Sequence, residues 1–153
     1  GDVSGLSAEV ALACDLRVCG ESTRWQFDGP QGLPLAGGMQ RLTRLAGRGR
    51  ALEAVLWGES IDAATVYRWG LVNRVVPDGH ALETARDVAR TIASRGPLGV
   101  RYTKEAIVRG IELPLEHGLK LETDLATLLQ ATADRAEGVR AFIEKRPPEF
   151  TGE

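Results

Sequence analysis

The sequence predicts an α/β fold with a mixed first half and a second half that is almost entirely helical. Strand-like stretches at 16–19, 23–27 and 71–76 alternate with helix-like stretches in the first half. Beyond them, apolar residues recur at helical spacing nearly to the end of the chain, with Gly or Pro at the interruptions. The change of pattern predicts two parts, residues 1–77 and residues 78–153.

The first predicted helix begins at a turn of small residues and runs to about Asp15. Ser4 or Ser7 can cap it through a hydroxyl oxygen, and Gly5 allows a sharp entry of the chain. First-turn N–H groups lack partners inside a helix, so they favour a nearby negative charge. Glu9 follows within this turn. Its carboxylate either complements the helix dipole or, in a dry setting, acts as an acid or base.

Three more helices are predicted before the strand at 71–76, over 37–45, 51–57 and 60–69. Ser60 is the expected cap of the third. The glycines that open the first could cradle a phosphate, but no Walker or dinucleotide spacing is present. Packing in a core or an interface, rather than in a ligand cage, is expected of the aromatic residues in this region, Trp57, Tyr67 and Trp69.

The second half predicts helices over 80–94, 97–110, 114–132 and 133–145. Asp134 with Glu137 three residues later is typical of a capping box. The third of these helices is apolar on more than one face, which favours packing between subunits. Its apolar positions are Leu115, Leu119, Leu121, Leu125, Leu128 and Leu129.

Composition excludes several classes of function. The 153 residues are 43% hydrophobic and 26% charged with a net charge of -2, which favours neither nucleic acid nor a membrane surface as a partner. Two cysteines, Cys14 and Cys19, give no disulfide framework and suggest a reducing, cytoplasmic setting. The histidines, His80 and His117, lie too far apart in sequence for zinc-ligand spacing, so no metal is expected.

A series of short motifs, weak singly, is specific in its order and covers nearly the whole chain. The first of them is Gly1-x-x-x-Gly5-x-x-x-Glu9-x-Ala11-x-x-Cys14-Asp15. The others are Phe27-x-x-Pro30, Gly37-Gly38-x-Gln40-Arg41-Leu42, Leu56-x-Gly58, Ala63-Ala64, Gly70-Leu71-Val72, Val75-Val76-Pro77 and Ala141-Phe142-x-Glu144-Lys145-Arg146-x-Pro148-x-Phe150. In these motifs the sequence resembles the crotonase superfamily, the enoyl-CoA hydratase/isomerase family.

The resemblance implies a crotonase-like (ClpP/crotonase spiral) fold, present here in part. The chain begins with Gly at the edge of its best motif, and it resembles the C-terminal half of such a protein. Residues 1–77 then correspond to the C-terminal part of the crotonase core. Residues 78–153 correspond to a helical oligomerisation region, which in this family forms trimers. A homotrimer or hexamer is therefore expected.

The resemblance also implies site residues. The backbone N–H of Leu6 would be one oxyanion donor, with the second donor in the missing front half, and Glu9 would be the acid or base. Substrate-binding roles fall on Gly5, Pro30, Gln31, Phe142 and Lys145. Phe142 and Lys145 either belong to an ordinary solvated helix end, where the dipole favours a positive charge, or, as the resemblance implies, reach the nucleotide end of CoA bound to a neighbouring subunit. Two departures stand out: Gly5-Leu6-Ser7 replaces a triple glycine, and Gln31 stands where the family has a second catalytic carboxylate.

The expected function is that of an enoyl-CoA hydratase/isomerase-like enzyme of fatty acid metabolism, a lyase or isomerase. Its substrate would be an acyl-CoA thioester, and it would need no metal or redox cofactor. The missing front half and the missing second Glu could impair turnover. The alternative is a non-catalytic or truncated crotonase-fold subunit that binds partners or acyl-CoA without turnover.

Overall fold

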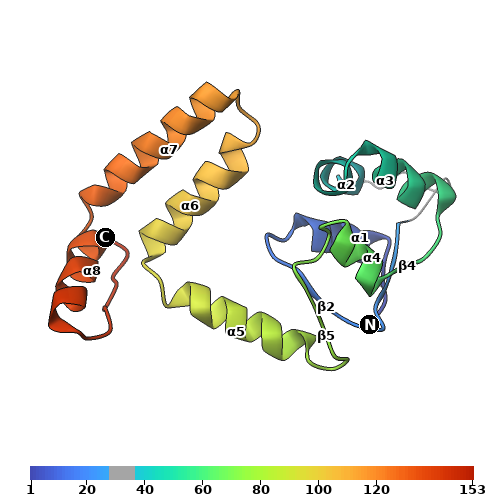
Figure 1. The fold of residues 1–153 in the computed structure, drawn as a ribbon, viewed down its shortest axis with the longest axis horizontal. Coiled ribbons are helices and arrows are strands. Elements are labelled where there is room, and N and C mark those ends of the chain that lie inside the picture. The colour runs from blue at the N-terminus through green and yellow to red at the C-terminus, as the bar shows by residue number, and fades with distance from the viewer. Residues whose placement is uncertain (28–36) are drawn as a thin grey trace. The chain divides into compact units, whose positions relative to one another are not determined.

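The computed structural model describes residues 1–27 and 37–153, which form two compact units, Gly1–Asp87 and Val88–Glu153 (Figure 1). The helix α5 (Ala81–Ala93) begins in the first unit and ends in the second. The predicted division into residues 1–77 and 78–153 assigns a role to each part, and that assignment stays a prediction. In the described residues, no helix combines the length and apolarity that a bilayer crossing needs.

Two small sheets organise the first unit. In one, β1 (Val3–Ser4) runs parallel to β3 (Arg24–Gln26), which pairs antiparallel with β4 (Ile61–Asp62). In the other, β2 (Val18–Gly20) runs parallel to β5 (Arg74–Val76). The strands predicted at 16–19 and 23–27 are thus confirmed within two residues.

The third strand, predicted over 71–76 from an apolar run, is shorter than expected. Its first residues, Leu71 and Val72, are buried in the core and precede the strand, which begins at Arg74. The Leu71 N–H donates to the Val66 carbonyl, 2.9 Å away, and so closes the preceding helix instead of joining the sheet. Leu71 and Val72 are therefore buried by following the helix end into the core, and their apolar character did not require them to form a strand.

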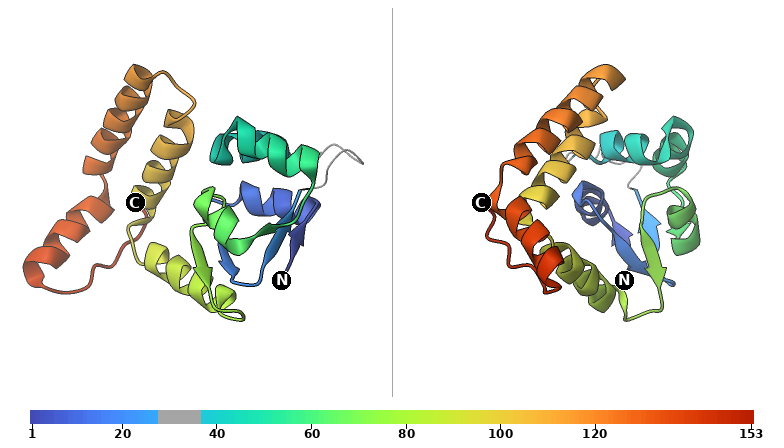
Figure 2. Two further views of the ribbon diagram at one scale, coloured as in Figure 1. Left: turned by 45° about the vertical axis from the view of Figure 1, so that its right-hand side comes forward. Right: turned by 60° about the vertical axis from the view of Figure 1, so that its left-hand side comes forward.

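Helices pack around these sheets in the first unit (Figure 2). The predicted helix at 51–57 begins earlier, at Arg48, and its second half is a π-helix. The elements are α1 (Leu6–Ala13), α2 (Gly38–Ala46), α3 (Arg48–Leu52), the π-helix η1 (Glu53–Trp57) and α4 (Ala63–Arg68).

One hydrophobic core joins these elements. Ala8 of α1 and Leu42 of α2 are both fully buried within it, which fixes the N-terminal half of α1 against α2. Its members come from strands and helices far apart in sequence: Ala8, Leu12, Cys19, Trp25, Phe27, Leu42, Ala51, Ala54, Ala63, Val66, Leu71 and Val72.

The predicted serine caps are wrong. The residue before α1 is Gly5, and the Ser7 hydroxyl instead donates to the Ser4 carbonyl (2.7 Å) and accepts the Ser4 N–H (3.0 Å). A short polar side chain can satisfy its own turn as readily as a helix end. At α4 the cap is Asp62 and not Ser60: the Asp62 carboxylate accepts the Thr65 N–H at 2.7 Å.

The second unit contains three long helices, α6 (Pro97–Gly110), α7 (Leu115–Gln130) and α8 (Ala133–Glu144). α6 and α7 pack side by side as a hairpin (Figure 1). All three predicted helices are confirmed with ends within two residues. Helical periodicity and Gly or Pro at the ends are local signals, so they survive without knowledge of the tertiary fold.

The predicted capping box at α8 is wrong. Thr132 is the cap, and its hydroxyl accepts the Arg135 N–H at 3.1 Å. Asp134 lies inside the helix and accepts hydrogen bonds from the C-terminal tail, and Glu137 binds Arg146. The two residues whose spacing suggests a capping box therefore bind the C-terminal tail instead of capping the helix.

Several large apolar residues, for which a core or an interface is predicted, are exposed in the described structure. Trp57 and Tyr67 have most of their surface accessible, so core packing within this chain is wrong for both, while an interface role stays a prediction. Trp69 is half-buried, and the Arg50 guanidinium lies 5.8 Å from the centre of its ring. Among the leucines of α7, Leu125 is buried and Leu119 is exposed.

Candidate active site

The turn into α1 places a row of backbone donors. Gly5 adopts φ 52° and ψ -128°, a conformation that residues with a side chain avoid, and its carbonyl accepts the N–H groups of Ala8 (3.1 Å) and Glu9 (3.2 Å). The N–H groups of Leu6 and Ser7 come first in the helix and have no intrahelical acceptor. The Leu6 side chain is mostly exposed, so a residue larger than Gly fits there without disturbing its backbone N–H.

Glu9 is a buried carboxylate beside the start of a second helix. Its side chain projects from α1 toward α2, and the residue is only 7% exposed. The Gly38 N–H, the first of α2, donates to Glu9 Oε2 at 3.0 Å. The Glu9 carboxylate therefore lies at the N-terminus of α2 and accepts a hydrogen bond from its first N–H. Two residues 29 positions apart in sequence therefore form one site.

Gly38 leaves no space for a side chain at this point. A Cβ atom there would lie 2.5 Å from Glu9 Cγ and 3.0 Å from Glu9 Cδ. Gly37, one residue earlier, has φ 81° and also requires glycine. The sequence allowed a phosphate cradle at this pair, for which it carries no nucleotide-binding spacing, and it did not predict the contact with Glu9. The signal was present, because two consecutive glycines at a helix start indicate a close approach by another group.

The structure brings together three of the predicted site residues, Gly5, Leu6 and Glu9, in the first unit. Pro30 and Gln31 lie outside the described residues. Phe142 and Lys145 lie in the second unit, three residues apart at the end of α8. Phe142 is 84% exposed, and Lys145 has a left-handed backbone with φ 54°.

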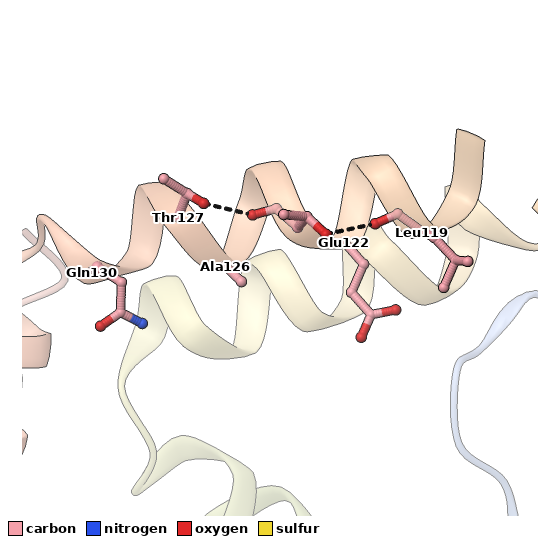
Figure 3. A pocket seen from close by; sticks show the side chains of 6 residues that line it. Leu119, Glu122, Ala126, Thr127 and Gln130 are labelled. Atoms are coloured by element: carbon pink, nitrogen blue, oxygen red, sulfur yellow. Dashed lines mark hydrogen bonds between the residues drawn. The ribbon is translucent and has the colours of Figure 1, made fainter. Parts of the chain in front are cut away.

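Other parts of the described surface offer less chemistry. A shallow hollow on α7 is lined by Leu119, Glu122, Thr123, Ala126, Thr127 and Gln130 (Figure 3). The hydroxyl groups of Thr123 and Thr127 donate to carbonyl groups of their own helix, at 2.9 and 2.8 Å. The described residues contain no cluster of three His, Cys, Asp or Glu side chains that could hold a metal ion. Among the described residues, Glu9 is therefore the acid–base group whose burial and hydrogen bonding best suit proton transfer.

The arrangement around Glu9 is suited to proton transfer next to a developing anion. A buried carboxylate exchanges protons at a fixed position, and free N–H groups at a helix start stabilise negative charge on a nearby oxygen. The fold that carries this pair is the crotonase fold. The sequence model for "Enoyl-CoA hydratase/isomerase" matches residues 1–153, and the chain belongs to this family.

Relatives of known name cover the same range. The chain is 42% identical to the 2,3-dehydroadipyl-CoA hydratase of Escherichia coli K12, over 99% of this chain and 60% of that protein. It is 36% identical to the short-chain-enoyl-CoA hydratase of Clostridium acetobutylicum, over 95% of this chain and 57% of that protein. The crystal structure of an enoyl-CoA hydratase from Bacillus anthracis superposes with a TM-score of 0.93 at 42% identity, covering the whole chain and 60% of that structure.

The chain spans 51% to 60% of the length of the curated relatives that it matches. The similarity covers nearly all of this chain, so the predicted family and fold are both confirmed.

Proposed function

We propose that this chain supplies the acid–base carboxylate and one oxyanion donor of an active site for acyl-CoA thioesters, in an enzyme of the hydratase or isomerase type. The observation that supports this is the buried Glu9 carboxylate, oriented by the Gly38 N–H next to the start of α1. The names of the relatives, two of them hydratases of CoA thioesters, agree with it.

The chemistry follows from how charge moves in such a substrate. When water adds to the β carbon of an enoyl thioester, electrons move onto the thioester oxygen, and an N–H donor there lowers the barrier. In the proposal this donor is the Leu6 N–H, and the remainder of the full-length enzyme supplies a second. Glu9 accepts one proton of the attacking water as the remaining hydroxyl bonds to the β carbon. Glu9 then gives that proton to the α carbon, so the product has gained one water and the carboxylate is restored.

Isomerisation needs the same parts with one change. Glu9 removes a proton from the carbon next to the thioester carbonyl, and the enolate-like oxygen is held by the same donor. The proton then returns to the γ carbon, and the double bond has moved. A site with one carboxylate suffices for this reaction, which is relevant because Gln31, outside the described residues, stands where the family has its second carboxylate.

The rest of the proposal concerns binding and assembly. Gly5, Pro30 and Gln31 line the acyl end of the substrate, and Phe142 and Lys145 bind the nucleotide end of the CoA held by a neighbouring subunit. Neither metal nor redox cofactor takes part. The exposed leucines of α7 support a homotrimer or hexamer. The free thiols Cys14 and Cys19 agree with a cytoplasmic enzyme.

Replacing Glu9 tests the assignment directly. Glu9→Gln keeps the shape of the side chain and its hydrogen-bond acceptor but removes its ability to take a proton. We expect turnover of a short 2-enoyl-CoA to fall by about 10²- to 10⁴-fold, with binding of the thioester retained. Hydration is followed by loss of the enoyl absorbance, and binding by calorimetry.

Glu21→Gln is the matched control, since Glu21 is an exposed carboxylate of the same unit. A Glu9→Gln variant that keeps more than a tenth of the wild-type rate contradicts the acid–base role. A full-length wild-type protein, in which the second oxyanion donor is present, that binds the thioester and does not turn it over contradicts the proposed enzyme and supports a binding subunit.

A further inference from the structure

Two carboxylates of α8 hold the C-terminal tail of the chain. Asp134, only 4% exposed, accepts the N–H groups of Thr151 (2.7 Å) and Gly152 (3.1 Å) through Oδ1. Its own N–H donates to the Glu153 carbonyl at 3.1 Å. One turn further on, Glu137 Oε1 accepts the Glu149 N–H at 3.1 Å. Two side-chain carboxylates and one backbone N–H of α8 thus bind the backbone of the tail, which runs alongside this helix (Figure 1).

Glu137 also forms a salt bridge with Arg146, the second residue after α8. Arg146 Nη1 lies 2.6 Å from Glu137 Oε1, and Nη2 lies 3.1 Å from Oε2, which is the two-bond fork of a strong arginine–carboxylate pair. Arg146 Nε donates to Glu144 Oε2 at 2.6 Å. The Arg146 bonds, with the Glu149 N–H, lower the pKa of Glu137 to about 2, so the pair is fully charged near neutral pH.

The residue between the helix end and Arg146 is Lys145, and its backbone is strained. It is the one residue other than glycine with positive φ in the described structure. The Arg146 N–H donates to the Ala141 carbonyl (3.1 Å) and the Lys145 N–H to the Phe142 carbonyl (3.3 Å). These two bonds form a Schellman motif, in which the left-handed position is usually glycine.

A long side chain at a position that favours glycine is an outlier in need of a reason. Such strain persists only where surrounding bonds hold it, and it is concentrated at functional positions. Here the surrounding bonds are those of Arg146 with Glu137 and Glu144. They fix the residue directly after Lys145 and thereby fix the direction in which Lys145 leaves the backbone.

We propose that Glu137 is a positioning residue for substrate binding: through Arg146 it fixes the left-handed turn that presents Lys145, beside the exposed Phe142, to the nucleotide of CoA. This inference rests on the proposed function, in which Lys145 and Phe142 bind that nucleotide. Glu137 itself does not touch the substrate. Its effect is confined to the part of CoA that Lys145 reaches.

The test compares two thioesters that differ only in the nucleotide. The enoyl thioester of CoA carries it, and the same enoyl thioester of pantetheine lacks it. KM and kcat are measured for both substrates with Lys145→Gln, Glu137→Gln and Arg146→Lys, the last of which keeps the charge but loses the fork. Glu149→Gln is the matched control, since Glu149 contributes its N–H and not its side chain to the tail. Circular dichroism verifies that each variant is folded.

We expect Lys145→Gln, Glu137→Gln and Arg146→Lys each to raise KM for the CoA thioester by about tenfold, with kcat and the pantetheine thioester unaffected. Glu149→Gln should behave as the wild type.

If Lys145→Gln raises KM while folded Glu137→Gln and Arg146→Lys do not, the positioning role is overturned and the proposed function stands. If KM rises equally for both thioesters, Glu137 acts on the fold and the positioning role is likewise overturned. If Lys145→Gln leaves KM unchanged, the nucleotide contact in the proposed function is wrong, and the inference falls with it.

Discussion

The two units of this chain are stabilised in different ways. In the first, twelve apolar residues from distant parts of the sequence form one buried core around two short sheets. In the second, the buried apolar residues among those described are Leu125 and Ala141. Order there comes from contacts between elements that follow one another along the chain. These are the α6–α7 hairpin, the Thr132 cap of α8, and the tail that Asp134 and Glu137 of α8 hold.

The difference also separates the two predicted parts of the site. Glu9 depends on a contact across 29 residues, between α1 and α2, so it depends on the core of the first unit. Lys145 depends on contacts within α8 and the turn that ends it, which in the described structure involve no residue earlier in the chain than Glu137. Changes in the first core should therefore affect acid–base chemistry, and changes near the end of α8 should affect binding.

Removing a buried side chain from the core of the first unit should change the free energy of unfolding the most. Leu42 is fully buried in α2, so Leu42→Ala should lower the free energy of unfolding by about 2–5 kcal/mol. All three tryptophans, Trp25, Trp57 and Trp69, lie in the first unit, so tryptophan fluorescence during urea unfolding reports on that unit.

The matched control comes from the second unit. Leu119 in α7 is 55% exposed, and Leu119→Ala, followed by circular dichroism, should cost less than about 1 kcal/mol. Equal losses from the two substitutions would contradict the contrast between a packed unit and a locally ordered one.

The next effect concerns the contact that positions Glu9. In Gly38→Ala the new Cβ would lie 2.5 Å from Glu9 Cγ, so the carboxylate must move, and overpacking of this kind costs about 1–3 kcal/mol. We expect lower stability by urea unfolding and a lower rate with a short enoyl-CoA.

Gly49→Ala is the control, because a Cβ there meets nothing within 4 Å and the residue is helical. That change should stabilise the protein by about 0.4–1 kcal/mol and leave the rate unchanged. An active, fully stable Gly38→Ala variant would show that the close approach of Glu9 to α2 is not required.

The sequence predicted the second unit better than the first for a physical reason. Helices over 97–110, 114–132 and 133–145 follow from periodicity and end signals, which are local. Caps were predicted less well. Ser7 bonds its own turn and Asp134 bonds the tail, and nothing in the spacing distinguishes those partners from a helix end.

The candidate site divides along the same line. The position of Glu9 in a helix first turn follows from the sequence, and its role was implied by the family resemblance. The Gly38 N–H on its carboxylate did not follow, because burial of α1 against α2 is a result of the whole core. Likewise, Glu137 lies in α8 and Arg146 lies beyond its end. Helical periodicity does not predict which residues meet once the chain has left the helix, so this pair did not follow from the sequence.

The smallest change in the free energy of unfolding is expected at Lys145. A residue with a side chain in the left-handed region costs about 1 kcal/mol relative to glycine, so Lys145→Gly should raise the free energy of unfolding by roughly that amount. The same change at Lys120, an exposed position inside α7, should instead lower it by about 0.5–1 kcal/mol, because glycine loses more backbone entropy in a helix. Both are measured by circular dichroism during urea unfolding. Opposite signs for one substitution show that Lys145 is held under strain by its neighbours, whereas a loss of stability at both positions shows that the turn is relaxed and that its lysine needs no functional reason.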